Sequence, residues 1–197
     1  MSTLTQTLEQ IERQKALWDA AQPLPASLLE QLREDWEVTQ TYNSNAIEGN
    51  TLTLAETKVI LLHGVTVGGK QINEHLEAVS HRDAMHLMMY AAQMKRPLEE
   101  MLVLELHRIL FNRIDDDDAG RYRSTRTSVT GSGRTFPMLM NLILLHHEYP
   151  PVFVPVEQRV AYVHALWAIE ERNVTVLDEL IAQITLQSLE TMVAVVA

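Results

Sequence analysis

Apolar side chains recur every three to four residues along most of the chain. This is the period of an amphipathic α-helix, in which positions i, i+3, i+4 and i+7 share one face. The pattern therefore predicts an all-α fold. The predicted helices cover about residues 27–47, 53–63, 73–94, 98–111, 138–147, 156–172 and 176–193.

Short local motifs predict where some of these helices begin and end. Residues 27–30 (Ser-x-x-Glu) and 53–56 (Thr-x-x-Glu) have the spacing of a capping box, in which a hydroxyl and a carboxylate satisfy free backbone N–H groups. Asn73 is the predicted cap of the next long helix. Gly49 can take the left-handed conformation that ends a helix.

The same period predicts which face of each helix is buried. In helix 73–94 the apolar stripe consists of Leu76, Val79, Leu87, Met88 and Ala91. In the last two helices the stripes are Val156, Val160, Val163 and Trp167, and then Leu177, Ile181 and Ile184. These residues are predicted core positions.

Residues 114–134 break the helical pattern. An acidic run is followed by residues 121–129, which are rich in Thr and Ser and carry no helical apolar stripe. A segment of this composition that ends in a glycine loop is typical of a β-hairpin. We predict one exposed hairpin, or flap, in an otherwise helical domain.

Length and composition limit the class of protein. A chain of 197 residues is expected to form one domain, and its net charge of −10 argues against a nucleic-acid-binding surface, which needs clustered Lys and Arg. The sequence has no cysteine, so disulfides and thiolate chemistry are excluded. It shows neither an export signal nor an apolar run near 18 residues, which predicts a soluble cytoplasmic protein that does not span a membrane.

The acidic run at residues 115–118, followed by Gly120, has some features of a calcium-binding loop. In an EF-hand frame, however, Ala119 would take a ligand position and Arg126 would replace the bidentate Glu. A solvated acidic loop is the favoured interpretation. The histidines are scattered, without the His-Glu-x-x-His spacing of a zinc helix, and we predict no metal site from spacing.

A short glycine loop, Gly131-Ser132-Gly133-Arg134, lies directly before a predicted helix. Backbone N–H groups at a helix N-terminus, beside an arginine, can bind an anion or a phosphate. The loop lacks the frame and the lysine of a P-loop, and a plain turn is the alternative interpretation.

The second candidate is the run from Ser44 to Asn50. Its acidic residue, Glu48, lies in the last turn of a predicted helix, where the helix dipole disfavours a negative charge. A carboxylate in this place suggests a cationic partner elsewhere in the fold, most naturally an arginine. The alternative is the frayed end of a helix, with Gly49 and Asn50 as terminators.

Together with Ala119-Gly120-Arg121-Tyr122-Arg123, these two segments resemble the Fic-domain family, whose members commonly transfer AMP from ATP to a hydroxyl group of a target protein. Ser44-x-x-x-Glu48-Gly49-Asn50 is similar to the inhibitory helix of the class that carries this element N-terminal to the core. Residues 106–123 resemble the approach to the family's flap. Residues 131–151 resemble the second half of the Fic signature and the helix that follows it.

The resemblance implies roles for particular residues and a division of the chain. Ser44, Glu48, Gly49 and Asn50 would form the inhibitory motif, in a helical extension of residues 1–52. Gly131, Ser132, Gly133 and Arg134 would bind the phosphates of ATP, in a Fic-like helical core of residues 53–197. ATP and Mg²⁺ would be the cofactors, and the flap would align a target protein by strand pairing. A homodimer is left open.

The chain departs from the family signature, His-Pro-Phe-x-(Asp/Glu)-Gly-Asn-Gly-Arg-x-x-Arg, in its catalytic half. Aligned on the glycines, the acidic position is Thr130, the Asn position is Ser132 and the final Arg position is Pro137. The histidine position falls on Arg126, within the flap. No catalytic His or Mg²⁺-binding acid is found, and the resemblance implies an internal deletion near residue 130.

Two functions follow from this resemblance. One is a protein adenylyltransferase that is auto-inhibited through Glu48, because in the family the inhibitory Glu prevents productive placement of ATP. The other is a catalytically silent, internally deleted Fic remnant that acts at most as a protein-interaction module. In either case we expect the first long helix to bring Ser44 and Glu48 to residues 131–134, where Arg134 and the flap arginines are the nearby cations.

Overall fold

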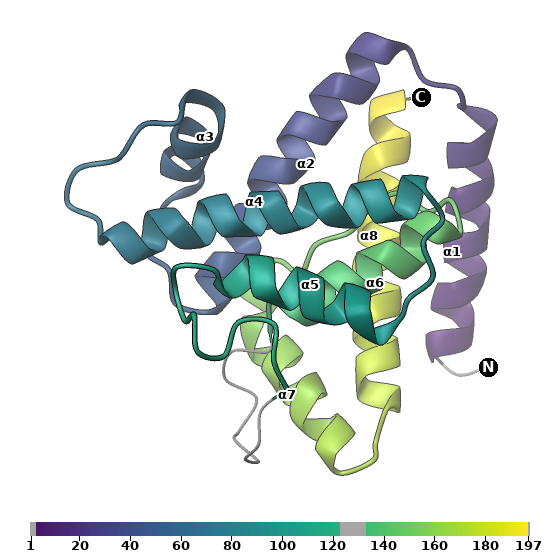
Figure 1. The fold of residues 1–197 in the computed structure, drawn as a ribbon. Coiled ribbons are helices and arrows are strands. Elements are labelled where there is room, and N and C mark those ends of the chain that lie inside the picture. Colours follow the sequence, from purple (N-terminus) through teal and green to yellow (C-terminus); the bar gives the residue numbers. More distant parts are fainter. Residues whose placement is uncertain (1–2, 123–132, 197) are drawn as a thin grey trace.

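The computed structural model describes residues 3–122 and 133–196 of the chain (Figure 1). The helices are α1 (Thr3–Ala20), α2 (Ala26–Ile47), α3 (Leu54–His63), α4 (Ile72–Gln93), α5 (Glu100–Phe111), α6 (Thr135–His146), the 3₁₀-helix η1 (Val156–Gln158), α7 (Arg159–Glu170) and α8 (Thr175–Val196). The described residues contain no strand, and the predicted all-α class is confirmed. From residue 123 onward, the predicted hairpin at residues 121–129 lies outside the described residues.

Helix α4 crosses the molecule and organises the fold (Figure 1). α5 and α6 pack along it, α3 packs near its N-terminal end, and α2 crosses it. α1 and α8 run side by side, and α7 packs against α8. Because α4 touches α2, α3, α5 and α6, it carries both a large part of the core and one wall of the candidate site described below.

Two apolar clusters form most of the interior. The first joins α4, α5 and α6 through side chains that include Ala84, Met85, Met88, Leu102, Leu106, Leu110, Met138 and Leu142. The second joins α6, α7 and α8 through side chains that include Met140, Tyr162, Ala165, Leu177, Leu180 and Ile184. α6 contributes to both clusters, since it is apolar around most of its circumference.

A buried amide fixes the segment that follows α6. The side chain of Asn141 is fully buried, and its Nδ2 donates to the carbonyl oxygen of Val152 at 2.8 Å. The backbone N–H of Val152 donates in return to Asn141 Oδ1 at 2.7 Å. Both polar ends of the amide are thus satisfied without water, and the chain after α6 is held against the core.

The predicted helix starts are right for α3 and wrong for α2 and α4. The capping box of α3 is present, with Thr53 and Glu56 each accepting a hydrogen bond from the other's backbone N–H. α2 begins at Ala26 with Pro25 as its N-cap, so Ser27 lies inside the first turn and the box predicted at residues 27–30 does not form. In α4 the box uses Gln71 and Glu74, so Asn73 lies inside the helix.

Two further starts differ from the prediction. α6 begins at Thr135, three residues before the predicted start, with Pro137 in its first turn. Proline is tolerated there because the first N–H groups of a helix have no intrahelical acceptor. α5 begins at Glu100, two residues later than predicted after Pro97.

The predicted buried face of α7 is wrong. Val160 and Trp167 are 79% and 55% exposed, whereas Tyr162, Ala165 and Ala168 are buried. The buried face therefore carries two alanines, whose small side chains let α7 approach its neighbours closely, and one large tyrosine. In α8 the predicted stripe is confirmed at Leu177 and Ile184, which are both buried.

Residues 1–52, which the resemblance implies to be a helical extension, contain α1 as well as α2, and the apolar period predicted no helix over α1. Ile11 of α1 packs against Ala182 and Leu189 of α8. By length and composition alone, α8 is long and apolar enough to cross a membrane. In this structure it packs instead against α1 and α7, and it supplies side chains to two apolar clusters.

Candidate functional site

The last turns of α2 are buried although they are polar. Gln40, Thr41, Asn43, Ser44 and Asn45 are all less than 9% exposed. Asn43 Oδ1 accepts a hydrogen bond from the backbone N–H of Val156 at 2.8 Å, which ties α2 to the start of η1. These residues are buried against the rest of the fold, so this helix end is not the frayed terminus of the alternative interpretation.

An arginine of α7 donates a hydrogen bond to a free carbonyl group at the C-terminus of α2. Arg159 Nε donates to the carbonyl oxygen of Ile47 at 2.6 Å. The last carbonyl groups of a helix lack intrahelical donors and carry partial negative charge, so an arginine is well suited to this place. It also offsets part of the unfavourable field that Glu48 experiences at the same helix end.

Glu48 is the C-cap residue of α2, and Gly49 follows it with φ +101°, in the left-handed region that was predicted for it. The backbone N–H of Asn50 donates to the carbonyl oxygen of Asn45 at 3.0 Å. The Asn50 side chain makes three more contacts, described below. The inhibitory motif named by the resemblance is thus a tight turn at the end of a buried helix.

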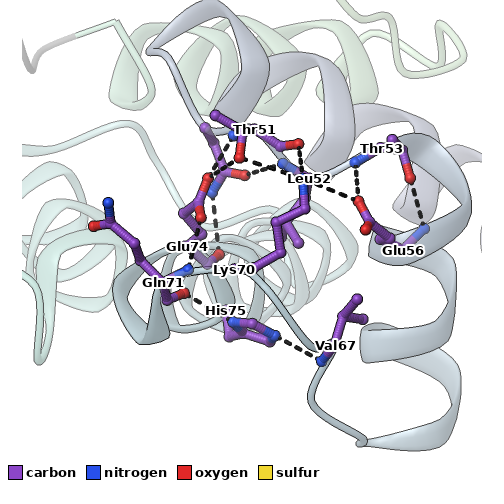
Figure 2. Close-up of polar contacts among 10 residues, drawn as sticks. Thr51, Leu52, Thr53, Glu56, Val67, Lys70, Gln71, Glu74 and His75 are labelled. Carbon is purple, nitrogen blue, oxygen red and sulfur yellow. Dashed lines mark hydrogen bonds and ion pairs between the residues drawn. The ribbon is translucent and has the colours of Figure 1, made fainter.

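The chain beyond this turn is anchored on the start of α4 (Figure 2). Glu74 Oε1 accepts hydrogen bonds from the backbone N–H and the hydroxyl of Thr51, each at 2.6 Å. Lys70 donates to the carbonyl oxygen of Thr51 and lies 3.4 Å from Glu56 Oε2. Hydrogen bonds from Thr51 and from the Gln71 N–H hold the pKa of Glu74 below its usual range. These contacts fix residues 48–53 relative to α4.

His75 closes the same network on its other side (Figure 2). It is buried, and its Nε2 accepts from the backbone N–H of Val67 at 2.9 Å. Its Nδ1 lies 2.9 Å from the carbonyl oxygen of Gln71, which requires the proton on Nδ1. The side chain of His75 therefore holds the backbone of the loop between α3 and α4 against α4.

Glu48 points at Gly133, the described glycine of the predicted phosphate loop. A Cβ atom added to Gly133 would collide with Glu48 Oε1, so only glycine allows this approach. Tyr162 also contacts this glycine, since its hydroxyl donates to the carbonyl oxygen of Gly133 at 3.0 Å. Burial, together with the negative charge of Glu48, raises the pKa of Tyr162 well above its usual value. The carboxylate thus lies at a buried glycine just before the start of α6.

Arg134 is held in the interior. It is 6% exposed, and its guanidinium lies 4.9 Å from the centre of the Phe111 ring. Its Nη1 is 3.4 Å from Glu77 Oε1 on α4. Arg134 was predicted to bind phosphate, whereas here its charge faces Glu77 and its side chain stacks on an aromatic ring.

His81 lies next to this arginine and is electrically neutral. It is fully buried, and its Nδ1 is 3.1 Å from the hydroxyl of Thr41 on α2. Burial, and secondarily the charge of Arg134, lower the pKa of His81 to about 3. At neutral pH it therefore adds no charge to the site.

The other predicted site residues fall into two groups. Ser44 and Gly133 both line a cavity of about 10 Å³, which is about the space of one water molecule. Gly131 and Ser132 lie outside the described residues, as do Arg126 and Thr130 at the aligned catalytic positions. Sequence reasoning missed Glu77, Tyr162 and Arg159, because each is distant in sequence from the motifs that it contacts.

A cavity of about 690 Å³ lies away from this site. Its walls come from α1, α2, α4, α6, the segment after α6, and α8, and include Trp18, Trp36 and Tyr149. No sequence motif pointed to this cavity, since its lining residues share no local pattern.

Comparison with known proteins agrees with the family resemblance. The protein adenylyltransferase Fic of Drosophila grimshawi is 28% identical over 199 residues, covering 76% of this chain and 41% of that protein. The protein of the same name from Drosophila persimilis is 26% identical over 215 residues, covering 84% of this chain and 42% of that protein. The chain thus spans about two fifths of the length of these curated relatives. No family model matches the chain.

Solved structures show the same fold. A Fic domain containing signalling protein from Bacteroides thetaiotaomicron superimposes with a TM-score of 0.84 at 21% identity, covering 95% of this chain and 97% of that one. A fragment of Fic-1 from C. elegans gives a TM-score of 0.84 at 23% identity, covering 97% of this chain and 73% of that one. The fold is a Fic-domain fold, and the resemblance of this chain to the Fic-domain family is confirmed.

The alignments also differ in length from this chain. The match to the D. grimshawi protein runs over 199 positions but takes up 76% of the 197 residues here, or about 150. About 50 aligned positions therefore have no counterpart in this chain. The match to the D. persimilis protein, over 215 positions and 84% of this chain, gives the same difference.

Proposed function

We propose that the chain derives from an auto-inhibited protein adenylyltransferase of the Fic type, which transfers AMP from ATP to a target hydroxyl, and that Glu48 is its inhibitory residue. The observation that carries this proposal is the approach of Glu48 to Gly133. A carboxylate at a glycine that precedes a helix N-terminus lies where a phosphate would be favoured. While Glu48 is there, like-charge repulsion disfavours a nucleotide phosphate.

The described residues of the site fit the phosphate of ATP better than they fit Mg²⁺. The space at Gly133 admits an anion, since it already admits the Glu48 carboxylate. No group of three acidic or histidine side chains that could hold Mg²⁺ occurs in residues 3–122 and 133–196. We therefore derive no step through a metal ion.

The second candidate function is the silent Fic remnant with a protein-interaction role. Arg126 and Thr130 stand at the aligned catalytic positions, and Arg cannot accept a proton at neutral pH. About 50 positions of the relatives' matched segment have no counterpart in this chain, which supports the internal deletion that the resemblance implies. Under this second candidate function, the chain has the Fic-domain fold but does not catalyse AMP transfer.

A binding titration separates the two functions. We expect Glu48→Gly to bind ATP in the presence of Mg²⁺ if the nucleotide site survives, and not to bind if the chain is a remnant. Isothermal titration calorimetry measures this directly. Glu34→Gly, which removes an exposed acid of the same helix, is the matched control and should behave as the unmodified chain.

We also expect that Glu48→Gly does not start AMP transfer. Removing the inhibitory carboxylate frees the anion site, but the chemistry still needs a base near the target hydroxyl and a carboxylate for Mg²⁺. The test is incubation of the variant with labelled ATP, Mg²⁺ and a cell extract. Labelled protein that depends on residues of this chain would contradict the expectation.

The proposal also includes a protein partner and a cellular location. We propose that residues 121–129 contact a target protein by strand pairing, as the resemblance implies, and that the protein acts in the cytoplasm. A pull-down with a chain lacking residues 123–129 checks the first point. Nucleic acid is not among the proposed partners, because the net charge is −10.

A further inference from the structure

Glu77 of α4 lies between Arg134 and the turn formed by Glu48, Gly49 and Asn50, which we call the inhibitory turn. Its Oε2 accepts a hydrogen bond from Asn50 Nδ2 at 2.8 Å. Its Oε1 is 3.4 Å from Arg134 Nη1. One carboxylate therefore joins a residue of the inhibitory motif to the arginine that follows Gly133.

Burial strengthens the contact with Arg134. The Arg134 side chain is 7% exposed and that of Glu77 is 20% exposed, so solvent screens the pair less than it would on the surface. Phe111 covers one face of the guanidinium. His81, the buried imidazole nearby, is neutral and therefore does not compete with Arg134 for the Glu77 carboxylate.

Asn50 holds Glu77 in place and belongs to the same turn as Glu48. Its Nδ2 also donates to the carbonyl oxygen of Glu74 at 3.1 Å, and its Oδ1 accepts from the backbone N–H of Leu52 at 2.9 Å. Asn50 thus has a fixed orientation. The turn therefore reaches residues 133–134 twice, through Glu48 at Gly133 and through Asn50 and Glu77 at Arg134.

We propose that Glu77 is a second inhibitory acid, a positioning residue that keeps the charge of Arg134 from a phosphate while Asn50 keeps Glu77 in place. This inference rests on the proposed nucleotide-binding function. Removing Glu48 opens the space at Gly133 but leaves Arg134 paired. The arginine becomes free for an anion only when the Glu77 charge is also removed.

The test compares the affinity for ATP, with Mg²⁺, of variants that fold as judged by circular dichroism and thermal melting. We expect Glu48→Gly/Glu77→Gln to bind about tenfold more tightly than Glu48→Gly, which equals about 1.4 kcal/mol. Glu77→Gln alone should change little, because Glu48 still lies at Gly133. The matched control is Asp83→Asn in the Glu48→Gly background, which removes an exposed acid of the same helix and should give no gain.

Two further variants separate an electrostatic role from a structural one. Arg134→Gln in the double variant should abolish the gain, because the gain depends on the freed guanidinium. Asn50→Ala with Glu48→Gly should give a smaller gain, about threefold, because Glu77 is retained but loses its hydrogen bond. The gain from Glu77→Gln should also shrink as KCl is raised, which a packing effect would not do.

The outcomes are distinguishable. If Glu48→Gly binds ATP and Glu77→Gln adds nothing, the role of Glu77 is wrong and the proposed function stands. If no variant binds ATP, both are overturned. If Glu48→Gly binds ATP and the double variant binds it about tenfold more tightly, both the proposed function and the inference are supported.

Discussion

The two halves of α4 bury different kinds of side chain. The first half, which faces α2, α3 and the turn at residues 48–50, buries the polar residues His75, Ser80 and His81 and only one apolar residue, Ala78. The second half, which packs against α5 and α6, buries Ala84, Met85, Met88, Ala91 and Ala92. One continuous helix is therefore the wall of a polar site at one end and part of an apolar core at the other.

The two halves of α4 therefore contribute differently to the stability of the fold. In the apolar half, close-packed side chains lose free energy whenever a methylene group is removed. Around the polar half, several buried polar groups of the described chain have no hydrogen-bond partner, among them Ser44 Oγ, both amide atoms of Asn45, His81 Nε2 and Arg134 Nε. A buried polar group without a hydrogen bond costs free energy, so the polar half contributes less to stability than the apolar half.

The largest expected effect is in the apolar half. Met88→Ala should lower the free energy of unfolding by about 3 kcal/mol, because Met88 is fully buried and its removal leaves a cavity. Urea unfolding at pH 7 measures this change. Met101→Ala on α5, where the side chain is 72% exposed, is the control and should change stability by less than about 0.5 kcal/mol. Equal effects of the two variants would contradict the burial of Met88 in the apolar half of α4.

The next effect is a pH dependence in the polar half. His81 stays neutral in the fold until its pKa of about 3, whereas an unfolded histidine takes up a proton near pH 6.5. Between these pH values the unfolded chain binds the extra proton, so stability falls as the pH falls. Between pH 7 and pH 5.5 the loss should be about 1 kcal/mol.

The measurement is urea unfolding of the unmodified chain and of His81→Asn at both pH values. The variant should lose this part of the pH dependence. His63→Asn, at an exposed position in the last turn of α3, should keep it. If the unfolding free energy of His81→Asn depends on pH as strongly as that of the unmodified chain, His81 does not cause the dependence and its burial is contradicted.

The smallest expected effect concerns the charge of Glu74 at the start of α4. Glu74→Gln should lower stability by about 0.5 kcal/mol at pH 7, since Gln can still cap the helix but lacks the charge near its N-terminus. The folded pKa of Glu74 is depressed, so its contribution is present above the unfolded value and is lost as the pH falls through the folded one. The stability difference between the variant and the unmodified chain should therefore shrink as the pH falls.

Thermal melting at pH 7 and pH 3 checks this decrease. Glu100→Gln, in the first turn of α5, is the control for removing an acid near a helix start. A difference for Glu74→Gln that persists unchanged at pH 3 would show that its hydrogen bonds do not depend on its charge.

Local sequence determined the helices and some of their ends. The apolar period predicted the class, and the capping box at Thr53 and the turn at Gly49 are present as predicted. These features depend on residues at most four positions apart, whose contacts are set by helix geometry itself. The resemblance led to the expectation that Glu48 would lie near residues 131–134, and the structure brings it to Gly133.

Only the tertiary structure decided which groups meet across helices. Glu77 pairs with Arg134 and Tyr162 binds Gly133, although nothing in the sequence near either residue marks it. α7 turns a face with Tyr162 inward and leaves Trp167 outside. The physical reason is that periodicity identifies an apolar stripe but not its neighbour. The partner of a side chain depends on how helices cross, and crossing is set by the packing of the whole core.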